Sequence, residues 1–90
     1  MTATEYNLAI IAGTVPLEYE KWRHGGWYTN VRYPSGAGGC VSRNYADKKW
    51  RIACDPRDFD TAPTFRNRDE AAKAEAALIL SGHHYEDVAE

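Results

Sequence analysis

Three extended segments with very short connections fill residues 27–55, and they restrict the fold more than any other feature of the chain. Residues 27–33 (WYTNVRY), 39–45 (GCVSRNY) and 48–55 (KKWRIACD) are rich in aromatic and β-branched side chains. The turn-forming run PSGAGG lies between the first two segments, and Ala46-Asp47 separates the last two. Because strands joined this closely pair antiparallel, we predict a β-meander.

Capping signals at both ends of residues 67–82 (NRDEAAKAEAALILSG) predict a C-terminal helix. Asn67 is followed three residues later by Glu70, and Gly82 stands where the helix would end. The residues expected on its apolar side recur at three- and four-residue spacing and are Ala71, Ala72, Ala74, Leu78 and Ile79. We expect this helix to pack on the sheet.

The N-terminal apolar run, residues 6–13 (YNLAIIAG), has a length that suits a buried strand better than a helix, although its periodicity does not distinguish the two. We therefore expect the α+β class, with an antiparallel sheet of three or four strands packed by one C-terminal α-helix. Ninety residues suffice for one core, which predicts a single domain over residues 1–90.

The strand register can be predicted by requiring one face of the sheet to be apolar. Such a register pairs Val31 with Val41, and Val41 with Ile52. The face under the helix then carries Trp27, Val31, Val41, Trp50, Ile52 and Cys54. The opposite, solvent-facing side carries Tyr28, Asn30, Arg32, Ser42, Asn44, Lys49 and Arg51.

The net charge of −2 conceals a strong segregation of charge along the chain. Residues 21–57 hold eight Lys and Arg against two Asp, whereas residues 58–90 hold three Lys and Arg against eight Asp and Glu. The first 20 residues add three Glu and no basic residue. Since soluble proteins usually intersperse the two signs, we infer a functional surface with one electropositive region.

Catalytic and metal-binding patterns are weak. Cys40 and Cys54 are expected to be free thiols in a reducing compartment, and their mutual contact is left open. A nucleophile and base could be drawn from these thiols and His24, His83 or His84, but nothing in the sequence places them together. Cysteines and histidines could also bind zinc, but Cys40 and Cys54 are too far apart in sequence to match the closely spaced cysteine pairs of structural zinc sites. We therefore expect no enzyme activity, no metal and no cofactor.

The chain contains no apolar run long enough to span a membrane, and its start lacks the basic region and long apolar stretch of a signal peptide. We expect a cytoplasmic protein without a membrane partner.

The candidate binding residues are Tyr28, Asn30, Arg32, Lys49 and Arg51 from the predicted open face of the sheet, together with Arg43. Lys, Arg, Asn and aromatic side chains contact phosphates and bases, but a solvated sheet face is polar in any case. The sequence pI of about 5.9 argues against a dedicated nucleic-acid domain. An acidic protein partner fits such a face equally well.

Residues 48–79, together with the two preceding segments, resemble in layout the three-stranded sheet plus helix of AP2 and integrase arm-binding DNA modules. Their sheets end in a similar passage from Thr-Phe, here residues 64–65, into Glu-Ala-Ala, here residues 70–72. The resemblance covers residues 27–80. It implies that the basic sheet face, with Arg32, Arg43, Lys49 and Arg51, reads DNA.

In size and style the whole chain also resembles the small proteins of phages and mobile elements, of which anti-CRISPR inhibitors are the best-known kind. This resemblance implies stoichiometric binding to a protein subunit of a host nucleic-acid-processing complex. Asp58, Asp60, Glu70 and Glu75 would then act as phosphate mimics, while the basic sheet holds an acidic surface. We expect such a non-enzymatic inhibitor, with direct DNA or RNA binding by the basic face as the alternative.

Overall fold

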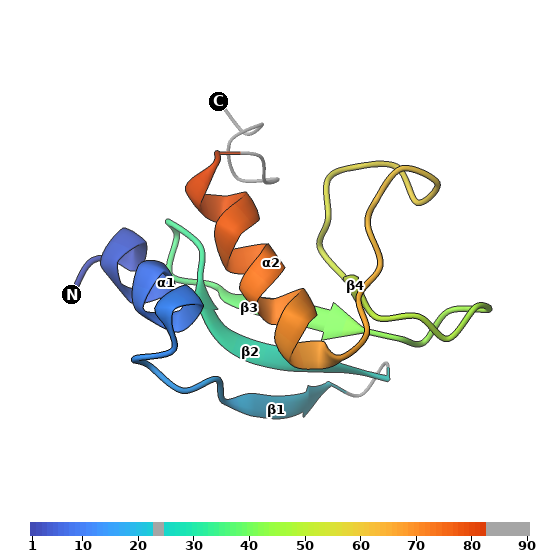
Figure 1. The fold of residues 1–90 in the computed structure, drawn as a ribbon, viewed down its shortest axis with the longest axis horizontal. Helices are drawn as coiled ribbons and strands as arrows, with labels where there is room; N and C mark the ends of the chain where they lie inside the picture. The colour runs from blue at the N-terminus through green and yellow to red at the C-terminus, as the bar shows by residue number, and fades with distance from the viewer. Residues whose placement is uncertain (23–24, 83–90) are drawn as a thin grey trace.

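The computed structural model describes residues 1–22 and 25–82, which form an antiparallel sheet covered by two helices (Figure 1). The strands lie in the order β1-β2-β3-β4, so each pairs with its neighbour in sequence. This arrangement confirms the α+β class, the meander and the packing of a C-terminal helix on the sheet. The elements are α1 (Ala3–Ala12), β1 (Tyr19–Trp22), β2 (Gly26–Arg32), β3 (Gly38–Ser42), β4 (Arg51–Ile52) and α2 (Arg68–Leu80).

The expectation of a strand over residues 6–13 is wrong, because this run lies in helix α1. Thr2 and Glu5 form a capping box, in which the Glu5 N–H donates to Thr2 Oγ1 over 3.1 Å and the Thr2 N–H donates to Glu5 Oε1 over 2.9 Å. Gly13 ends the helix in the left-handed conformation, with φ of 84°. The fourth strand is instead Tyr19–Trp22, which pairs with β2.

The predicted pairing of Val41 with Ile52 is confirmed, whereas the predicted pairing of Val31 with Val41 is wrong. Val41 lies opposite Trp27, and the β2–β3 ladder is irregular between Thr29 and Arg32. The error spans an even number of residues, so Val31 and Val41 stay on their predicted face. Val31, Val41 and Ile52 are accordingly buried.

Strand β4 is much shorter than the predicted strand over residues 48–55. Lys48 has a φ of 58°, which no regular strand residue adopts. Trp50 forms an isolated bridge with Phe65, whose N–H donates to the Trp50 carbonyl over 2.9 Å. The chain returning toward α2 thus pairs with the residue just before β4.

Helix α2 begins where the sequence predicts, with the Glu70 N–H donating to Asn67 Oδ1 over 2.9 Å. Its buried residues are Ala71, Ala72, Glu75, Ala76 and Ile79. Ala74 and Leu78, expected at the centre of the stripe, are only half-buried. The helix is therefore rotated relative to the prediction, and this rotation brings the carboxyl group of Glu75 into the core.

Neither α1 nor α2, the helices within the described residues, has the length and apolar character that crossing a membrane requires.

Candidate binding surface

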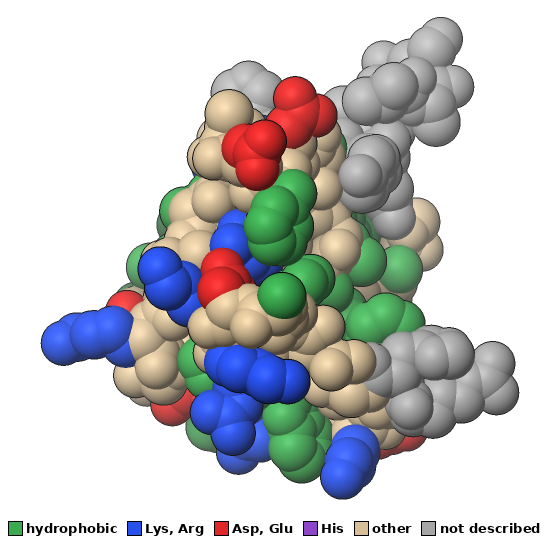
Figure 2. Space-filling view, turned by 90° about the vertical axis from the view of Figure 1, so that its right-hand side faces the viewer, with side chains coloured by type: hydrophobic (Ala, Val, Ile, Leu, Met, Phe, Trp, Pro, Cys, Tyr) green, Lys and Arg blue, Asp and Glu red, His purple; other side chains and the backbone are tan. Residues whose placement is uncertain are grey.

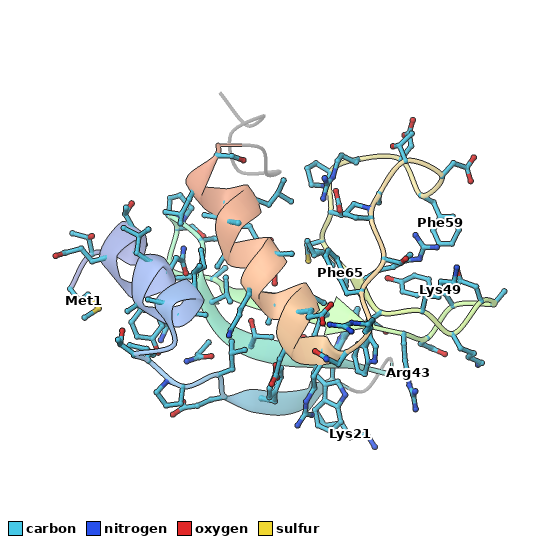
Figure 3. All side chains as sticks on the ribbon, in the orientation of Figure 1. Met1, Lys21, Arg43, Lys49, Phe59 and Phe65 are labelled. Carbon is cyan, nitrogen blue, oxygen red and sulfur yellow. The ribbon has the colours of Figure 1, made fainter. Side chains whose placement is uncertain are left out.

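Three basic side chains lie over aromatic rings at one end of the sheet. They are Lys21 from β1, Arg43 just after β3 and Arg68, the first residue of α2; the rings include Trp27 and Trp50. We call the surface formed by these five residues the cationic edge. Figure 2 shows Lys and Arg side chains gathered around hydrophobic ones on the lower half of this end, and Figure 3 labels Lys21 and Arg43.

Trp27 is the centre of the first cation–aromatic group. The β1–β2 ladder places Lys21 opposite it, with Lys21 Nζ 5.9 Å from the ring centroid. The guanidinium carbon of Arg68 lies 4.8 Å from the same ring. Two cations thus lie near one indole ring. Each such cation–aromatic contact contributes about 0.5–1 kcal/mol at exposed sites.

The start of α2 is attached to β1 through Tyr19. The Arg68 guanidinium carbon lies 3.9 Å from the Tyr19 ring centroid, and the Tyr19 hydroxyl donates a hydrogen bond to the Asp69 carboxylate. Burial, together with this hydrogen bond, raises the pKa of Tyr19. These contacts fix Arg68 in position, so its charge belongs to a rigid part of the surface.

The second cation–aromatic group joins Arg43 to Trp50. Arg43 is exposed, and its guanidinium carbon lies 5.7 Å from the Trp50 ring centroid. Trp50 is half-buried and packs against the core. Its backbone bridge to Phe65 anchors the indole beneath the arginine.

The expectation that Arg51 points to solvent is wrong, since its side chain is enclosed by the hairpin and the loop that follows β4. Its guanidinium donates to Asp47 Oδ2 over 2.7 Å and to the Phe59 carbonyl over 3.3 Å, and its carbon lies 3.9 Å from the Phe59 ring. The Lys49 N–H and the Arg51 guanidinium both donate to Asp47 and lower its pKa. Within the described residues, Arg51 Nε finds no hydrogen-bond partner.

The other candidate residues of the open sheet face are dispersed. Tyr28 is 44% exposed beside Trp22, with ring centroids 5.9 Å apart. Arg32 is exposed and lies over Tyr6, 5.7 Å from its ring centroid. Successive side chains of a strand point to opposite faces of the sheet, so Tyr28 points away from the face that carries Trp27 and its partner Lys21. Tyr28 and Arg32 therefore face away from the cationic edge.

The predicted basic face also does not form around three further residues, which are Asn30, Ser42 and Lys49. Asn30 is half-buried and holds the segment before β1, accepting from the Glu18 N–H and donating to the Pro16 carbonyl and the Tyr6 hydroxyl. Ser42, expected in solvent, is buried. Lys49 is exposed between β3 and β4 and lies outside both strands. Of the six candidate residues, the structure places only Arg43 within the cationic edge.

The four acidic candidates occupy three different settings. Asp58 and Asp60 are exposed on the loop between β4 and α2, on either side of Phe59, which is 54% exposed. Glu70 pairs with Arg66 over 2.8 Å, and the hydrogen bond from this arginine lowers the pKa of Glu70. Glu75 is fully buried, so the expectation that it mimics a phosphate at the surface is wrong.

Glu75 lies beneath α2 against the sheet. One carboxylate oxygen accepts from the Tyr33 hydroxyl over 2.6 Å, and the other accepts from the Cys40 N–H over 3.0 Å. Burial raises the pKa of Glu75 to about 8, so the side chain is mostly protonated at neutral pH. Gly39 makes room for the carboxyl group, because a Cβ at that position would overlap it.

Among residues 1–22 and 25–82, no three His, Cys, Asp or Glu side chains are placed to hold a metal ion. The histidines weighed as ligands or bases, His24, His83 and His84, lie outside the described residues. No family model, curated protein or solved structure matches this chain.

Sequence reasoning missed Lys21, Arg68 and the exposed edges of the two tryptophans. Lys21 does belong to the basic segment 21–57, but its position over Trp27 depends on a strand that the sequence analysis did not predict. Arg68 follows the predicted helix cap, so its place at the start of α2 could have been found. The contact between Arg68 and Trp27 could not have been predicted, since this contact depends on how α2 crosses the sheet.

Proposed function

We propose that this chain is a non-enzymatic binding protein that docks through the cationic edge on an acidic surface of a host nucleic-acid-processing complex. In this proposal it acts stoichiometrically in the cytoplasm of the host cell, as anti-CRISPR inhibitors do. The observation that carries the proposal is the grouping of Lys21, Arg43 and Arg68 over aromatic rings at one end of the molecule.

The chemistry of the cationic edge suits a protein interface. Trp, Tyr and Arg are the residues most enriched among the side chains that dominate binding energy. Aromatic rings fixed beneath the cations lose little conformational freedom on binding, which lowers the cost of association. A complementary partner therefore has carboxylates around a shallow apolar patch.

The distribution of charge supports a bipolar contact. Figure 2 shows acidic side chains at the top of the same end of the molecule, above the basic group. The exposed acids Asp58 and Asp60 come from the loop between β4 and α2. A partner that carries both signs would be fixed in orientation as well as attracted, whereas a nucleic acid would be repelled by the acidic part.

The test is the effect of the chain on CRISPR immunity in living bacteria. The chain is expressed in strains whose type I or type II system targets a phage, and the efficiency of plating of that phage is measured. The proposal predicts plating restored by orders of magnitude in at least one system, with an empty vector as control. Full immunity in every strain, with the chain shown to be expressed and folded, would contradict it.

Direct nucleic-acid binding is the second candidate, and the half-exposed Trp27 and Trp50 beside arginines favour it because bases stack on such rings. A titration against labelled single- and double-stranded DNA and RNA at two salt concentrations measures it. Phosphate contacts predict tight binding at low salt that weakens steeply as salt rises. Absence of binding at low salt would exclude this candidate.

A further inference from the structure

Cys40 and Cys54 meet across the β3–β4 pair. The Ala53 N–H donates to the Cys40 carbonyl over 2.9 Å, so Cys54 follows directly after the residue that pairs with Cys40. The two thiols lie close enough for each to shift the pKa of the other. Both are free, and they differ in access, because Cys40 is buried and Cys54 is exposed.

The two thiols are chemically unequal. The neighbouring Cys40 lowers the pKa of Cys54 to about 7, whereas the neighbouring Cys54 together with burial raises the pKa of Cys40. The charged and titratable groups that couple to the pair are Glu75 from α2 and Tyr45 from the hairpin. Cys54 is thus the exposed thiolate that meets an oxidant, and Cys40 is the protonated partner held against it.

We propose that Cys40 and Cys54 form a reversible disulfide when the protein meets a hydroperoxide. The Cys54 thiolate attacks one oxygen of hydrogen peroxide, the O–O bond breaks, and Cys54 becomes a sulfenic acid. The departing hydroxide takes a proton from solvent and leaves as the first water. Cys40 sulfur then attacks the Cys54 sulfur, the S–O bond breaks, and the Cys40 proton leaves with the hydroxyl as a second water. The two thiols lose two electrons in total, and the peroxide gains them.

The disulfide would close a covalent ring at the base of the hairpin that joins β3 to β4. In Figure 1 this hairpin projects from the body of the molecule. It carries Arg43 and Trp50 of the cationic edge together with Lys48 and Lys49. Oxidation would therefore add a covalent restraint to a basic segment whose ladder between β3 and β4 consists of two residue pairs. This inference does not depend on the proposed function.

The experiment oxidises the reduced full chain with a small molar excess of hydrogen peroxide and maps its peptides by mass spectrometry. We expect one intramolecular Cys40–Cys54 linkage, a mass lower by about 2 Da, and recovery of both thiols with dithiothreitol. Closing a ring of this size should raise Tm by roughly 10 °C. A wild-type product with sulfinic acid at Cys54 and a free Cys40, or a dimer linked between chains, would overturn the proposal.

Two single variants distinguish the roles of the thiols. Cys40→Ser removes the resolving thiol, so oxidation should stop at sulfenic or sulfinic acid on Cys54. Cys54→Ser leaves the buried thiol, which should stay reduced under the same treatment. Equal peroxide reactivity of the two variants would contradict the assigned order. The linkage in the wild-type chain decides the proposal even if a variant fails to fold, which circular dichroism would reveal.

Discussion

At the scale of single residues, the fate of a charged side chain here depends on which partners the fold brings to it. Glu75 and Glu70 lie on the same helix, yet one is fully buried beside Tyr33 and the other pairs with Arg66 at the surface. Arg51 and Lys49 lie two positions apart, yet only Arg51 is enclosed. Each pair therefore supplies a test with its own control.

Glu75→Gln should flatten the pH dependence of stability. The pKa of Glu75 is raised from 4.5 to about 8 in the folded protein. Its stabilisation is therefore complete below about pH 4.5 and is lost as pH rises toward 8, by up to about 1.4 kcal/mol per pH unit. An amide is neutral at every pH, its oxygen can accept from the Cys40 N–H, and its NH2 group can donate to the Tyr33 hydroxyl oxygen, so this loss should disappear. Urea unfolding from pH 5 to about pH 8 measures it.

Glu70→Gln is the matched control, because the pKa of Glu70 is lowered and its contribution disappears as pH falls instead. The unfolding free energies of both variants are compared with that of the wild-type protein over the same pH range. If both variants lost stability with rising pH as steeply as the wild-type protein, the protonated state of Glu75 would be refuted.

Arg51→Ala should destabilise the fold by about 2 kcal/mol, since it removes the cation that pairs with Asp47 and opens a gap beside Phe59. Lys49→Ala, at an exposed position in the same hairpin, should change the unfolding free energy by less than about 0.5 kcal/mol. Chemical denaturation compares the two. Equal effects would mean that the enclosure of Arg51 does not stabilise the protein.

At the scale of elements, α1 is attached to the sheet through one buried amide. Asn7 donates to the Arg32 carbonyl over 2.7 Å and accepts from the Arg32 N–H over 2.9 Å. Arg32 ends β2 next to the irregular part of the β2–β3 ladder, where its backbone groups would otherwise need other partners. The amide side chain thus completes the edge of the sheet as a short strand would.

Asn7→Ala should therefore cost about 2–3 kcal/mol of unfolding free energy, because it leaves two backbone groups without their partner. Leu8→Ala, at the next position but 53% exposed, should cost less than about 0.5 kcal/mol. Thermal unfolding of both variants, analysed at a common temperature, measures the difference. A small loss for Asn7→Ala would show that α1 is held mainly by its other contacts, which are apolar packing and the hydrogen bond between Asn30 and Tyr6.

The elements also show which parts of the fold the sequence could predict. Helix α2 and the meander carry local signals, namely the Asn67 cap, the alternation in β2 and the turn-rich connections, and these were predicted correctly. Helix α1 carries an equally local signal in the capping box of Thr2 and Glu5, but the short apolar run was interpreted by its length. The capping box and Gly13 together are sufficient to predict a helix over this run.

The remaining differences depend on contacts distant in sequence. The β2–β3 ladder pairs Trp27 with Val41 and is irregular further along, and Trp50, just before the short β4, bridges to Phe65. The rotation of α2, which buries Glu75, depends on the space left by Gly39. No local pattern contains this information, and the same holds for the meeting of Lys21, Arg43 and Arg68.

At the scale of the whole molecule, the segregation of charge along the chain persists in the fold. The basic segment supplies Lys21 and Arg43 to the cationic edge, and the acidic segment supplies Asp58 and Asp60 to the loop beside it. Residues of the basic segment that lie elsewhere, such as Arg32 on the open sheet face, offer a direct comparison. The central claim is that binding depends on the position of the charge and not on its amount.

The measurement that tests this claim most directly is the efficiency of phage plating with two charge-reversal variants. Lys21→Glu combined with Arg43→Glu alters the cationic edge, while Arg32→Glu alters the opposite face; Arg68 is left intact because it also fixes the start of α2. Circular dichroism and Tm confirm that both variants fold. The account predicts that the double variant loses inhibition and that Arg32→Glu retains it. Retained inhibition by the double variant, with loss in Arg32→Glu, would contradict the account and assign binding to the open sheet face.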